Sequence, residues 1–277
     1  MPPLRPVDPR RLAWLRVEGV AEGAQDLARE RLAPCLARGG LAPVYEAKRR
    51  AIYRVDDPLL GSVALKEVRS GSWLRALLFR RFLPHPALRE LRAGAAFAAR
   101  GGATAGLLAA ALERDPLRLL RVFLCLRWVE RAQSLGVFLR GLGSEPDAEA
   151  LGPIAGALLA AARLGLVHGR HSGDNLLVTL ASGRLEIRVI DFAHASLGAG
   201  FEPEGFARDA GRVAAGLVIL GHASQATAMR LLGLLEADWP DPASAVRARE
   251  WLDAAFARSL AEGPPKGQRA LPGPRAR

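Results

Sequence analysis

Two polar residues, Asn175 and Asp191, each stand at the edge of a short apolar run and could bind a metal ion. Asn175 precedes Leu176-Leu177-Val178 and Asp191 follows Val189-Ile190, so each is predicted to lie at the end of a short β-strand. Their amide and carboxylate oxygens suit Mg²⁺, which proteins usually hold with one or two side chains together with phosphate oxygens. The pair therefore predicts a Mg²⁺ site that faces the phosphates of a nucleotide.

The scarcity of lysine and asparagine supports this prediction. Only three of the 39 basic residues are lysines, and Asn175 is the one asparagine of the chain. Lys66 ends the run Val63-Ala64-Leu65-Lys66, which has the form of the third strand of a protein kinase, where the lysine contacts the nucleotide phosphates. Arg and Lys differ in shape and hydration, so they do not replace each other freely at such a site. The alternative is that rare residues fall at these positions by chance.

A predicted helix over residues 87–100 follows the Lys66 strand and carries Glu90 in its first turn. In kinases, a glutamate on the helix after this strand pairs with the lysine and positions it. We therefore expect an ion pair between Glu90 and Lys66. The alternative is that Glu90 is a solvated charge on the helix surface.

The elements that must position these side chains fall into a strand-rich half and a helix-rich half. Strands are predicted over 43–47, 51–55, 62–68, 105–112 and 117–128, with a basic hairpin turn at 48–50 and a hinge at 127–130. Helices are predicted over 132–142, 148–166, 207–220, 224–236 and 243–260. The chain is thereby divided into a partly disordered lead-in (1–40), a nucleotide-binding N-lobe (41–130), a C-lobe with the catalytic loop and metal site (131–262), and a disordered basic tail (263–277).

Composition limits the class of protein. A chain of 277 residues, half of them hydrophobic, can bury a full core in one large domain or in two lobes. No apolar run reaches the roughly 18 residues of a membrane span, and the N-terminus lacks the apolar segment of a secretory signal. Cys35 and Cys125 form neither a disulfide framework nor a metal-binding spacing. These features predict a cytoplasmic protein.

The formal net charge of +11 favours an anionic partner, which could be a nucleic acid, a membrane surface or a phosphorylated substrate. The alternative is that the arginine content reflects a GC-rich genome. Nucleic-acid binding is not predicted, because none of the usual sequence motifs accompanies the charge. The stretch 73–83 is both apolar and cationic, so it could lie at a membrane interface or form a helix that faces the core.

The order of these features resembles the bacterial lipopolysaccharide kinase family, which comprises Kdo and heptose kinases of the WaaP and InaA type. The resemblance spans roughly residues 40–215. It rests on the hairpin, the strand ending in Lys66, the glycine turn after it, Arg89-Glu90-Leu91, the His168 turn with Asn175, and Ile190-Asp191-Phe192. It implies an α+β, protein-kinase-like fold with two lobes: a small antiparallel β N-lobe with one main helix, and a mostly helical C-lobe.

The same resemblance implies the activity and its cofactors. Lys66 would bind the phosphates of ATP, Glu90 would orient Lys66, and Asn175 and Asp191 would hold Mg²⁺. The γ-phosphoryl group of ATP would pass to a sugar hydroxyl of a lipid A–core glycolipid, on Kdo or heptose. The reaction would take place in the cytoplasm, with the protein attached peripherally to the inner face of the inner membrane. The sequence leaves the oligomeric state open.

The catalytic loop departs from the kinase pattern His-x-Asp-x-x-x-x-Asn, because Arg170 occupies the position of the aspartate. A guanidinium stays protonated and cannot accept the proton of the substrate hydroxyl. Asp174 and His171 are the nearby candidates for that role, and Arg170 could instead stabilise the transferring charge. The competing interpretation is a pseudokinase that binds nucleotide and acts by binding a partner. Phosphorylation of a small molecule, as in aminoglycoside phosphotransferases, also stays open.

The hairpin that would cover the nucleotide lacks the pattern Gly-x-Gly-x-x-Gly. Its turn is Lys48-Arg49-Arg50, so the side chains of Lys48 and Arg49 are predicted to contact the phosphates in place of backbone N–H groups. The alternative is an exposed basic tip with no ligand.

Overall fold

The structure is a computed structural model that describes residues 3–81, 84–142, 146, 148–181 and 184–263. The chain divides into two compact units. Unit 1 comprises residues 1–130 and the short segment 191–194, and unit 2 comprises 131–190 and 195–277. The predicted basic tail (263–277) lies outside the described residues except for Gly263. The assignment of nucleotide binding to one lobe and catalysis to the other stays a prediction.

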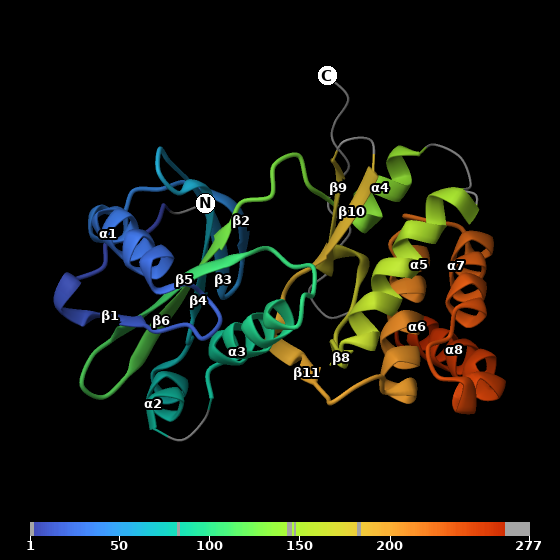
Figure 1. Cartoon of the computed structure of the whole chain (residues 1–277). Helices are drawn as coiled ribbons and strands as arrows, with labels where there is room; N and C mark the ends of the chain where they lie inside the picture. Colours follow the sequence, from blue (N-terminus) through green and yellow to red (C-terminus); the bar gives the residue numbers. More distant parts are fainter. Residues whose placement is uncertain (1–2, 82–83, 143–145, 147, 182–183, 264–277) are drawn as a thin grey trace. The chain divides into compact units, whose positions relative to one another are not determined.

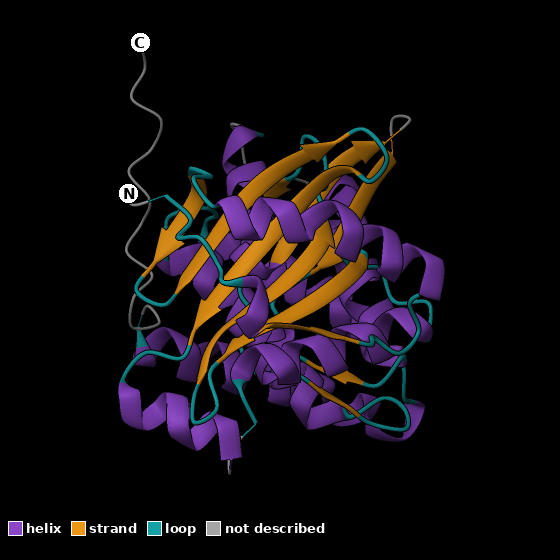
Figure 2. Ribbon diagram, turned by 90° about the vertical axis from the view of Figure 1, so that its left-hand side faces the viewer, coloured by secondary structure: helices purple, strands orange, loops and turns teal. Residues whose placement is uncertain are grey.

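Unit 1 is built on a six-stranded antiparallel sheet with the order β1-β5-β6-β4-β3-β2. Strands are drawn in orange in Figure 2. The strands are β1 (Leu12–Leu15), β2 (Pro43–Ala47), β3 (Arg50–Asp57), β4 (Gly61–Arg69), β5 (Leu107–Arg114) and β6 (Leu119–Arg127). Unit 1 also holds α1 (Glu22–Arg38), α2 (Trp73–Arg81) and α3 (Pro86–Ala99), which are labelled in Figure 1.

The two faces of this sheet carry separate apolar clusters. On one face, Leu32 and Leu36 of α1 belong to a cluster with Leu65 of β4 and with strand residues such as Tyr53 and Phe123. On the other face, α3 supplies Ala87 and Leu91, which cluster with Val68, Val122 and Leu124. Because side chains alternate along β4, Lys66 and Val68 point to the α3 face while Leu65 and Glu67 point to the α1 face.

The described part of the lead-in contains regular structure. Within residues 1–40, which the sequence predicted to be partly disordered, Leu4 and Val7 are buried against α1 and the sheet. Leu4 N–H donates to the Leu41 carbonyl at 2.8 Å, and β1 pairs with β5 as an edge strand. The four-residue β1 was missed because so short a run, placed between prolines and a glycine turn, shows no alternation to detect.

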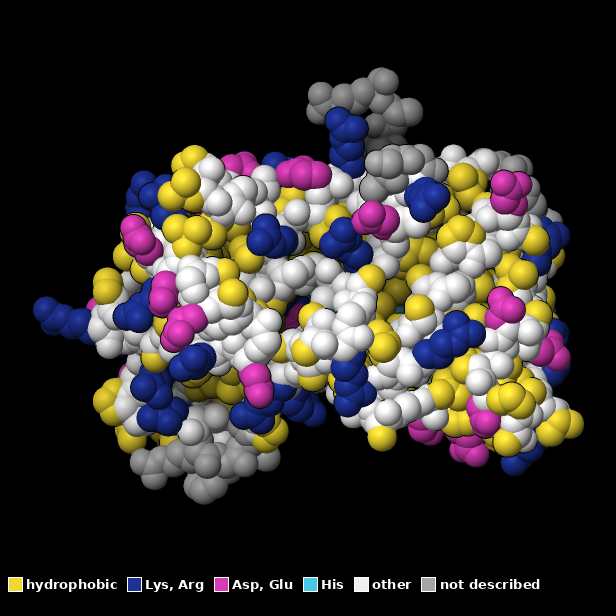
Figure 3. Space-filling view, in the orientation of Figure 1, with side chains coloured by type: hydrophobic (Ala, Val, Ile, Leu, Met, Phe, Trp, Pro, Cys, Tyr) yellow, Lys and Arg dark blue, Asp and Glu magenta, His cyan; other side chains and the backbone are white. Residues whose placement is uncertain are grey.

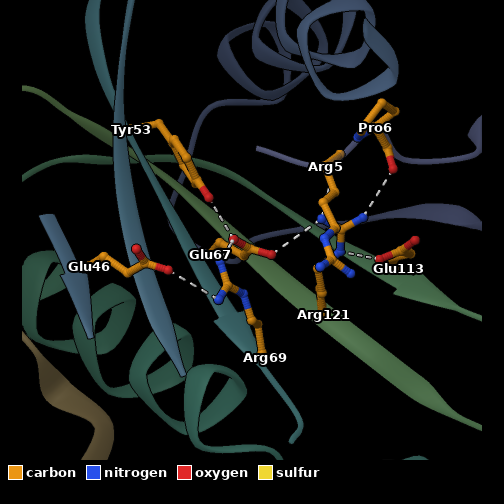
Figure 4. A network of polar contacts seen from close by, with 8 residues as sticks. All are labelled: Arg5, Pro6, Glu46, Tyr53, Glu67, Arg69, Glu113 and Arg121. Carbon is orange, nitrogen blue, oxygen red and sulfur yellow. Dashed lines mark hydrogen bonds and ion pairs between the residues drawn. The ribbon is translucent and has the colours of Figure 1, made fainter. Parts of the chain in front are cut away.

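A network of buried charges ties the lead-in to the sheet (Figure 4). Arg121 of β6 forms ion pairs with Glu67 and Glu113 and donates to the main-chain carbonyls of Arg5 and Pro6. Glu67 is 2% exposed and accepts further hydrogen bonds from Tyr53 (2.8 Å) and Arg69 (3.0 Å). A buried carboxylate requires such partners, because desolvation otherwise penalises its charge.

Unit 2 is mostly helical. Its helices are α4 (Leu135–Gly141), α5 (Ala148–Arg163), α6 (Pro203–Ile219), α7 (Gln225–Ala237) and α8 (Pro242–Glu262). β7 (Gln133–Ser134), β9 (Leu176–Ala181) and β10 (Arg184–Val189) form a three-stranded sheet, and β8 (Leu166–Val167) pairs with β11 (Ser196–Leu197). The predicted pair of strands around Asn175 and Asp191 is therefore present as the β9–β10 hairpin.

Candidate functional site

Lys66 and Glu90 form a buried ion pair inside unit 1. Lys66 Nζ lies 2.6 Å and 2.8 Å from the two carboxylate oxygens of Glu90, and both side chains are less than a tenth exposed. Burial works to lower the pKa of Lys66, but the charges of Glu90 and Asp191 outweigh it and raise the pKa. Burial also raises the pKa of Glu90, against the opposing charge of Lys66. The ion pair expected from the sequence is thus present, and it fixes the lysine ammonium on the α3 face of the sheet.

The start of α3 explains why Glu90 faces the sheet. His85 occupies the N-cap position, where its Nδ1 accepts a hydrogen bond from Ala87 N–H at 3.2 Å, and Pro86 has the backbone angle that a first helical residue needs. Glu90 and Leu91 then fall on the buried face of the helix together with Ala87. His85 is 1% exposed, and burial lowers its pKa to about 4.

Asp191 completes a charged cluster in unit 1. Its Oδ1 lies 3.1 Å from Lys66 Nζ and its Oδ2 lies 2.7 Å from Nη1 of Arg50. These cations outweigh the effect of burial, which acts to raise the pKa of Asp191, and bring it down to about 2. Asp191 has a φ of 62°, a left-handed conformation that non-glycine residues rarely adopt away from functional sites.

The residue after Asp191 anchors this strained turn. Phe192 is 3% exposed, and its ring lies against Phe97 with a centroid distance of 5.5 Å. Gly94 leaves room for that ring, since a Cβ there would lie 3.3 Å from Phe192 Cδ2. Packing of Phe192 on α3 therefore holds Asp191 beside Lys66 and Glu90.

Arg50 is a site residue that the predicted roles did not include. The sequence predicts that the basic turn 48–50 contacts the phosphates, but it assigns those contacts to Lys48 and Arg49 and gives no role to Arg50. In the structure, Arg49 lies over the turn that follows β4, where a Cβ at Gly71 would be 3.2 Å from its Nε. Lys48 is exposed in the hairpin turn. The roles of Lys48 and Arg49 stay predictions, and the contact that the hairpin makes with the cluster comes from Arg50.

The predicted catalytic loop lies in unit 2 and is held by Asp209 of α6. The Asp209 carboxylate accepts hydrogen bonds from His168 N–H at 2.5 Å and from Gly169 N–H at 3.0 Å. Arg212, one turn further along α6, donates to the Gly169 carbonyl. Sequence reasoning missed Asp209, because its position 41 residues after His168 shows no local pattern. Burial raises the pKa of Asp209, and the two backbone donors oppose this effect.

The loop also fixes Asn175. The side-chain Nδ2 of Asn175 donates to the Arg170 carbonyl at 3.0 Å, and the main-chain carbonyl of Asn175 accepts from Ile190 N–H at 2.9 Å. The hydrogen bond to Arg170 uses the side-chain nitrogen of Asn175, so the atom of this amide that could bind a metal ion is its oxygen. Arg170 is exposed, so its guanidinium is in contact with water.

The two other predicted catalytic residues differ in environment. His171 is 6% exposed and stacks on His168, with ring centroids 4.4 Å apart and planes 6° from parallel. Burial, and then the charge of His168, hold the pKa of His171 well below its usual range. Asp174 is half-buried. Burial, and then the charge of Arg140, lower the pKa of His222, and the charge of Asp174 acts in the opposite direction. Asp174 is thus the more accessible of the two groups.

The donor set of the predicted metal site fits Mg²⁺ bound together with a nucleotide. One carboxylate and one amide oxygen are hard donors, and Mg²⁺ normally takes its remaining ligands from phosphates and water. Among the residues that the structure describes, no group of three or more His, Cys, Asp or Glu side chains could hold a metal ion by itself. The binding of Mg²⁺ by Asn175 and Asp191 stays a prediction.

Comparison with known proteins identifies the fold. No family model and no curated protein matches the chain. The chain is similar to the solved structure of WaaP in complex with acyl carrier protein, with 16% identity over 91% of this chain and 98% of that chain and a TM-score of 0.58. It is also similar to the Rio2 kinase–ADP/Mg²⁺–phosphoaspartate complex from Chaetomium thermophilum, with 20% identity over 91% and 82% of the two chains and a TM-score of 0.45. The predicted α+β, protein-kinase-like fold is confirmed by the likeness to WaaP.

Proposed function

We propose that the protein is an ATP- and Mg²⁺-dependent kinase. The observation that carries this proposal is the cluster of Lys66, Glu90 and Asp191, because it provides a fixed ammonium beside a carboxylate on a protein-kinase-like fold. Lys66 would bind the nucleotide phosphates, Glu90 would hold Lys66 in place, and Asp191 with Asn175 would hold Mg²⁺. When bound, Mg²⁺ neutralises charge that develops on the transferring phosphoryl group.

The proton of the acceptor hydroxyl would pass to Asp174, since Arg170 cannot take it. Asp174 follows Gly173 in the loop that Asp209 anchors, and its carboxylate is half-buried. His171 is the weaker candidate, because it is buried against His168. Phosphoryl transfer depends mostly on positioning and charge stabilisation, so an exposed Arg170 is compatible with turnover.

The pseudokinase is the alternative, and the arginine at position 170 is the observation that favours it. If the protein binds nucleotide without transferring phosphoryl groups, Arg170→Asp should create turnover. If Asp174 is the base in an active kinase, Asp174→Asn should remove turnover while nucleotide binding stays intact. Release of ADP, measured on these two variants and the wild type with each candidate acceptor, separates the two functions.

The acceptor that we propose is a sugar hydroxyl on a lipid A–core glycolipid, as the resemblance to lipopolysaccharide kinases implies. The solved WaaP structure holds an acyl carrier protein, so an acyl carrier protein is the second partner to test. Among the described residues, no helix is long and apolar enough to cross a membrane. The resemblance to lipopolysaccharide kinases is the basis on which we propose peripheral attachment to the inner face of the inner membrane.

α2 is the element of unit 1 that would contact the lipid surface. Trp73 and Leu74 are 59% and 58% exposed at its start, and Arg75 and Arg80 of the same helix are also exposed. Several Lys and Arg side chains lie around the place of α2 in Figure 3. Exposed aromatic and aliphatic side chains flanked by arginines suit an anionic bilayer. Residues 82–83 of the predicted membrane stretch lie outside the described residues.

Co-sedimentation with vesicles tests this attachment. The wild type should bind vesicles that contain phosphatidylglycerol more strongly than neutral vesicles, and the double variant Trp73→Ser/Leu74→Ser should lose most of that binding. Val246→Ser is the control, because Val246 is an apolar residue that is 87% exposed on α8. Equal binding by the double variant and the control would refute a role for α2.

Calorimetric titration with Mg-ATP, together with measurement of ADP release, tests the kinase itself. We expect the wild type to bind Mg-ATP and Asp191→Ala to bind it much more weakly, because the metal loses its carboxylate ligand. Glu186→Ala is a suitable control, since Glu186 is an exposed carboxylate of β10 that pairs with Arg188. Failure of the wild type to bind any nucleotide would disprove the proposed function.

A further inference from the structure

Both carboxylate oxygens of Asp191 are engaged by cations. Lys66 contacts Oδ1 at 3.1 Å and Arg50 contacts Oδ2 at 2.7 Å. The cluster of Arg50, Lys66, Glu90 and Asp191 holds two positive and two negative charges, so these charges cancel. A nucleotide phosphate can be attracted to it only if a cation gives up its carboxylate partner or a metal ion adds charge.

Arg50 is the member of this cluster that can change its partner. Its side chain is 46% exposed, whereas those of Lys66 and Glu90 are 8% and 9% exposed. Lys66 is also fixed by two short contacts to Glu90, while Arg50 has one contact to Asp191. The arginine side chain is long and flexible, so it can turn toward a new anion without moving the strand.

The backbone beneath Arg50 points its side chain to the correct face. In the β3–β4 pairing, Ile52 lies opposite Lys66 and Arg50 lies opposite Val68, so Arg50 and Lys66 project from the same face of the sheet. Arg69 N–H donates to the Arg49 carbonyl at 2.9 Å and fixes the strand end next to Arg50. Arg49 extends instead over Gly71.

We propose that Arg50 is a ligand of the nucleotide phosphates and that it releases Oδ2 of Asp191 to the metal ion when it binds them. A guanidinium is a planar fork that matches phosphate oxygens as well as it matches a carboxylate. Arg50 thereby supplies the donors that a glycine-rich turn would otherwise offer from its backbone. This inference rests on the proposed nucleotide-binding function and names a phosphate ligand for it.

The inference has a distinctive consequence, because Arg50 and the metal ion use the same carboxylate oxygen. Removal of Arg50 should weaken nucleotide binding, since a charged donor to phosphate is lost. It should also lower the Mg²⁺ concentration that gives half of the maximal gain in nucleotide affinity, since Oδ2 of Asp191 loses its contact with Arg50. A residue with a merely structural role would not weaken nucleotide binding and at the same time strengthen the apparent binding of Mg²⁺.

The test is calorimetry of the full-length protein with a non-hydrolysable ATP analogue, first in EDTA and then across a Mg²⁺ series. Arg50→Ala should bind the metal-free analogue about tenfold or more weakly, the usual effect of losing one charge-assisted hydrogen bond. Its half-maximal Mg²⁺ concentration should fall, and Arg50→Lys should lie between Arg50→Ala and the wild type. Arg49→Ala should cause a smaller loss of affinity than Arg50→Ala.

Two further variants make the outcomes separable. Arg16→Ala removes one positive charge from unit 1 at an 81% exposed side chain and controls for net charge. Lys66→Ala reports on the nucleotide site itself. If Lys66→Ala loses binding while Arg50→Ala resembles Arg16→Ala in both affinity and Mg²⁺ dependence, this inference fails and the proposed function stands. If the wild type does not bind the analogue, both are overturned.

Discussion

The carboxylate of Asp209 in α6 accepts hydrogen bonds from two successive backbone N–H groups, those of His168 and Gly169, which lie 41 and 40 residues earlier in the chain. Gly169 adopts a φ of 76°, so its N–H could not be satisfied by a regular strand or helix at this point. Asp209 is 2% exposed and therefore replaces water as the acceptor for both groups. The shape of the predicted catalytic loop depends on this one side chain.

We expect Asp209→Ala to destabilise the protein by about 3 kcal/mol, because one buried and one partly buried backbone donor lose their acceptor. Asp209→Asn should cost less, about 1 to 2 kcal/mol, because its amide keeps one acceptor oxygen. Urea unfolding followed by circular dichroism measures both values. Equal stability of Asp209→Ala and the wild type would show that water satisfies the loop and that Asp209 does not shape it.

Breaking the Lys66–Glu90 pair should be costly, and removing both partners should cost less than the two single changes added together. Lys66→Met leaves Glu90 buried without its cation, for which about 3 to 5 kcal/mol is typical. Lys66→Met/Glu90→Leu replaces the pair with apolar side chains and should recover at least 1 kcal/mol of that loss. Denaturant unfolding of both single variants and the double variant completes the cycle. A sum that is strictly additive would show that the pair contributes no coupling.

His85 should make unit 1 sensitive to mild acid. Its folded pKa of about 4 lies below the usual value near 6.5, so between these values the unfolded chain binds a proton that the folded chain rejects. Its contribution is therefore complete above pH 6.5 and is lost as the pH falls toward 4, by up to about 3 kcal/mol. His85→Asn keeps a helix-capping acceptor but does not titrate. It should flatten the change in thermal midpoint between pH 6.5 and 4.5, whereas an unchanged slope would contradict this assignment.

The crossing of α6 and α8 depends on Gly211. A Cβ at this position would lie 2.6 Å from Ala255 Cβ and 2.7 Å from the backbone nitrogen of Phe256. Gly211→Ala should therefore force the helices apart and cost about 1 to 3 kcal/mol. Gly216 lies in the same helix with nothing within 4 Å of its potential Cβ, so Gly216→Ala should be neutral or stabilising by up to about 1 kcal/mol. In thermal unfolding, the midpoint of Gly211→Ala should fall and that of Gly216→Ala should not; an equal fall in both would contradict the packing.

Local patterns made the main features of the fold predictable. The strand ending in Lys66, the helix with Glu90 and the hairpin of β9 and β10 are each recognisable from a few neighbouring residues. The likeness to WaaP agrees with the fold class inferred from them. The expected pairing of Lys66 with Glu90 required only two adjacent elements, 24 residues apart in sequence.

The features that were missed depend on contacts between residues far apart in sequence. Arg50 and Asp191 are separated by 141 positions, and neither the hairpin turn nor the Asp-Phe pair indicates that they meet. Choosing among Lys48, Arg49 and Arg50 needed the strand register, since adjacent residues of a strand face opposite sides of the sheet. The burial of Leu4 and Val7 likewise needed α1, which packs against them, and the Arg121 side chain of β6 binds the Arg5 carbonyl between them.

The membership of residues 191–194 in unit 1 has a consequence for synthesis on the ribosome. The sheet strands and α1 to α3 emerge before residue 130, but Asp191 and Phe192 emerge only after 60 further residues that belong to unit 2. Until then, Lys66 and Arg50 have no aspartate to bind, and the α3 surface that receives Phe192 is uncovered. Nascent unit 1 therefore stays incomplete until the β9–β10 hairpin has been made and residues 191–194 have been added. In this it differs from domains that fold one after another as they are translated.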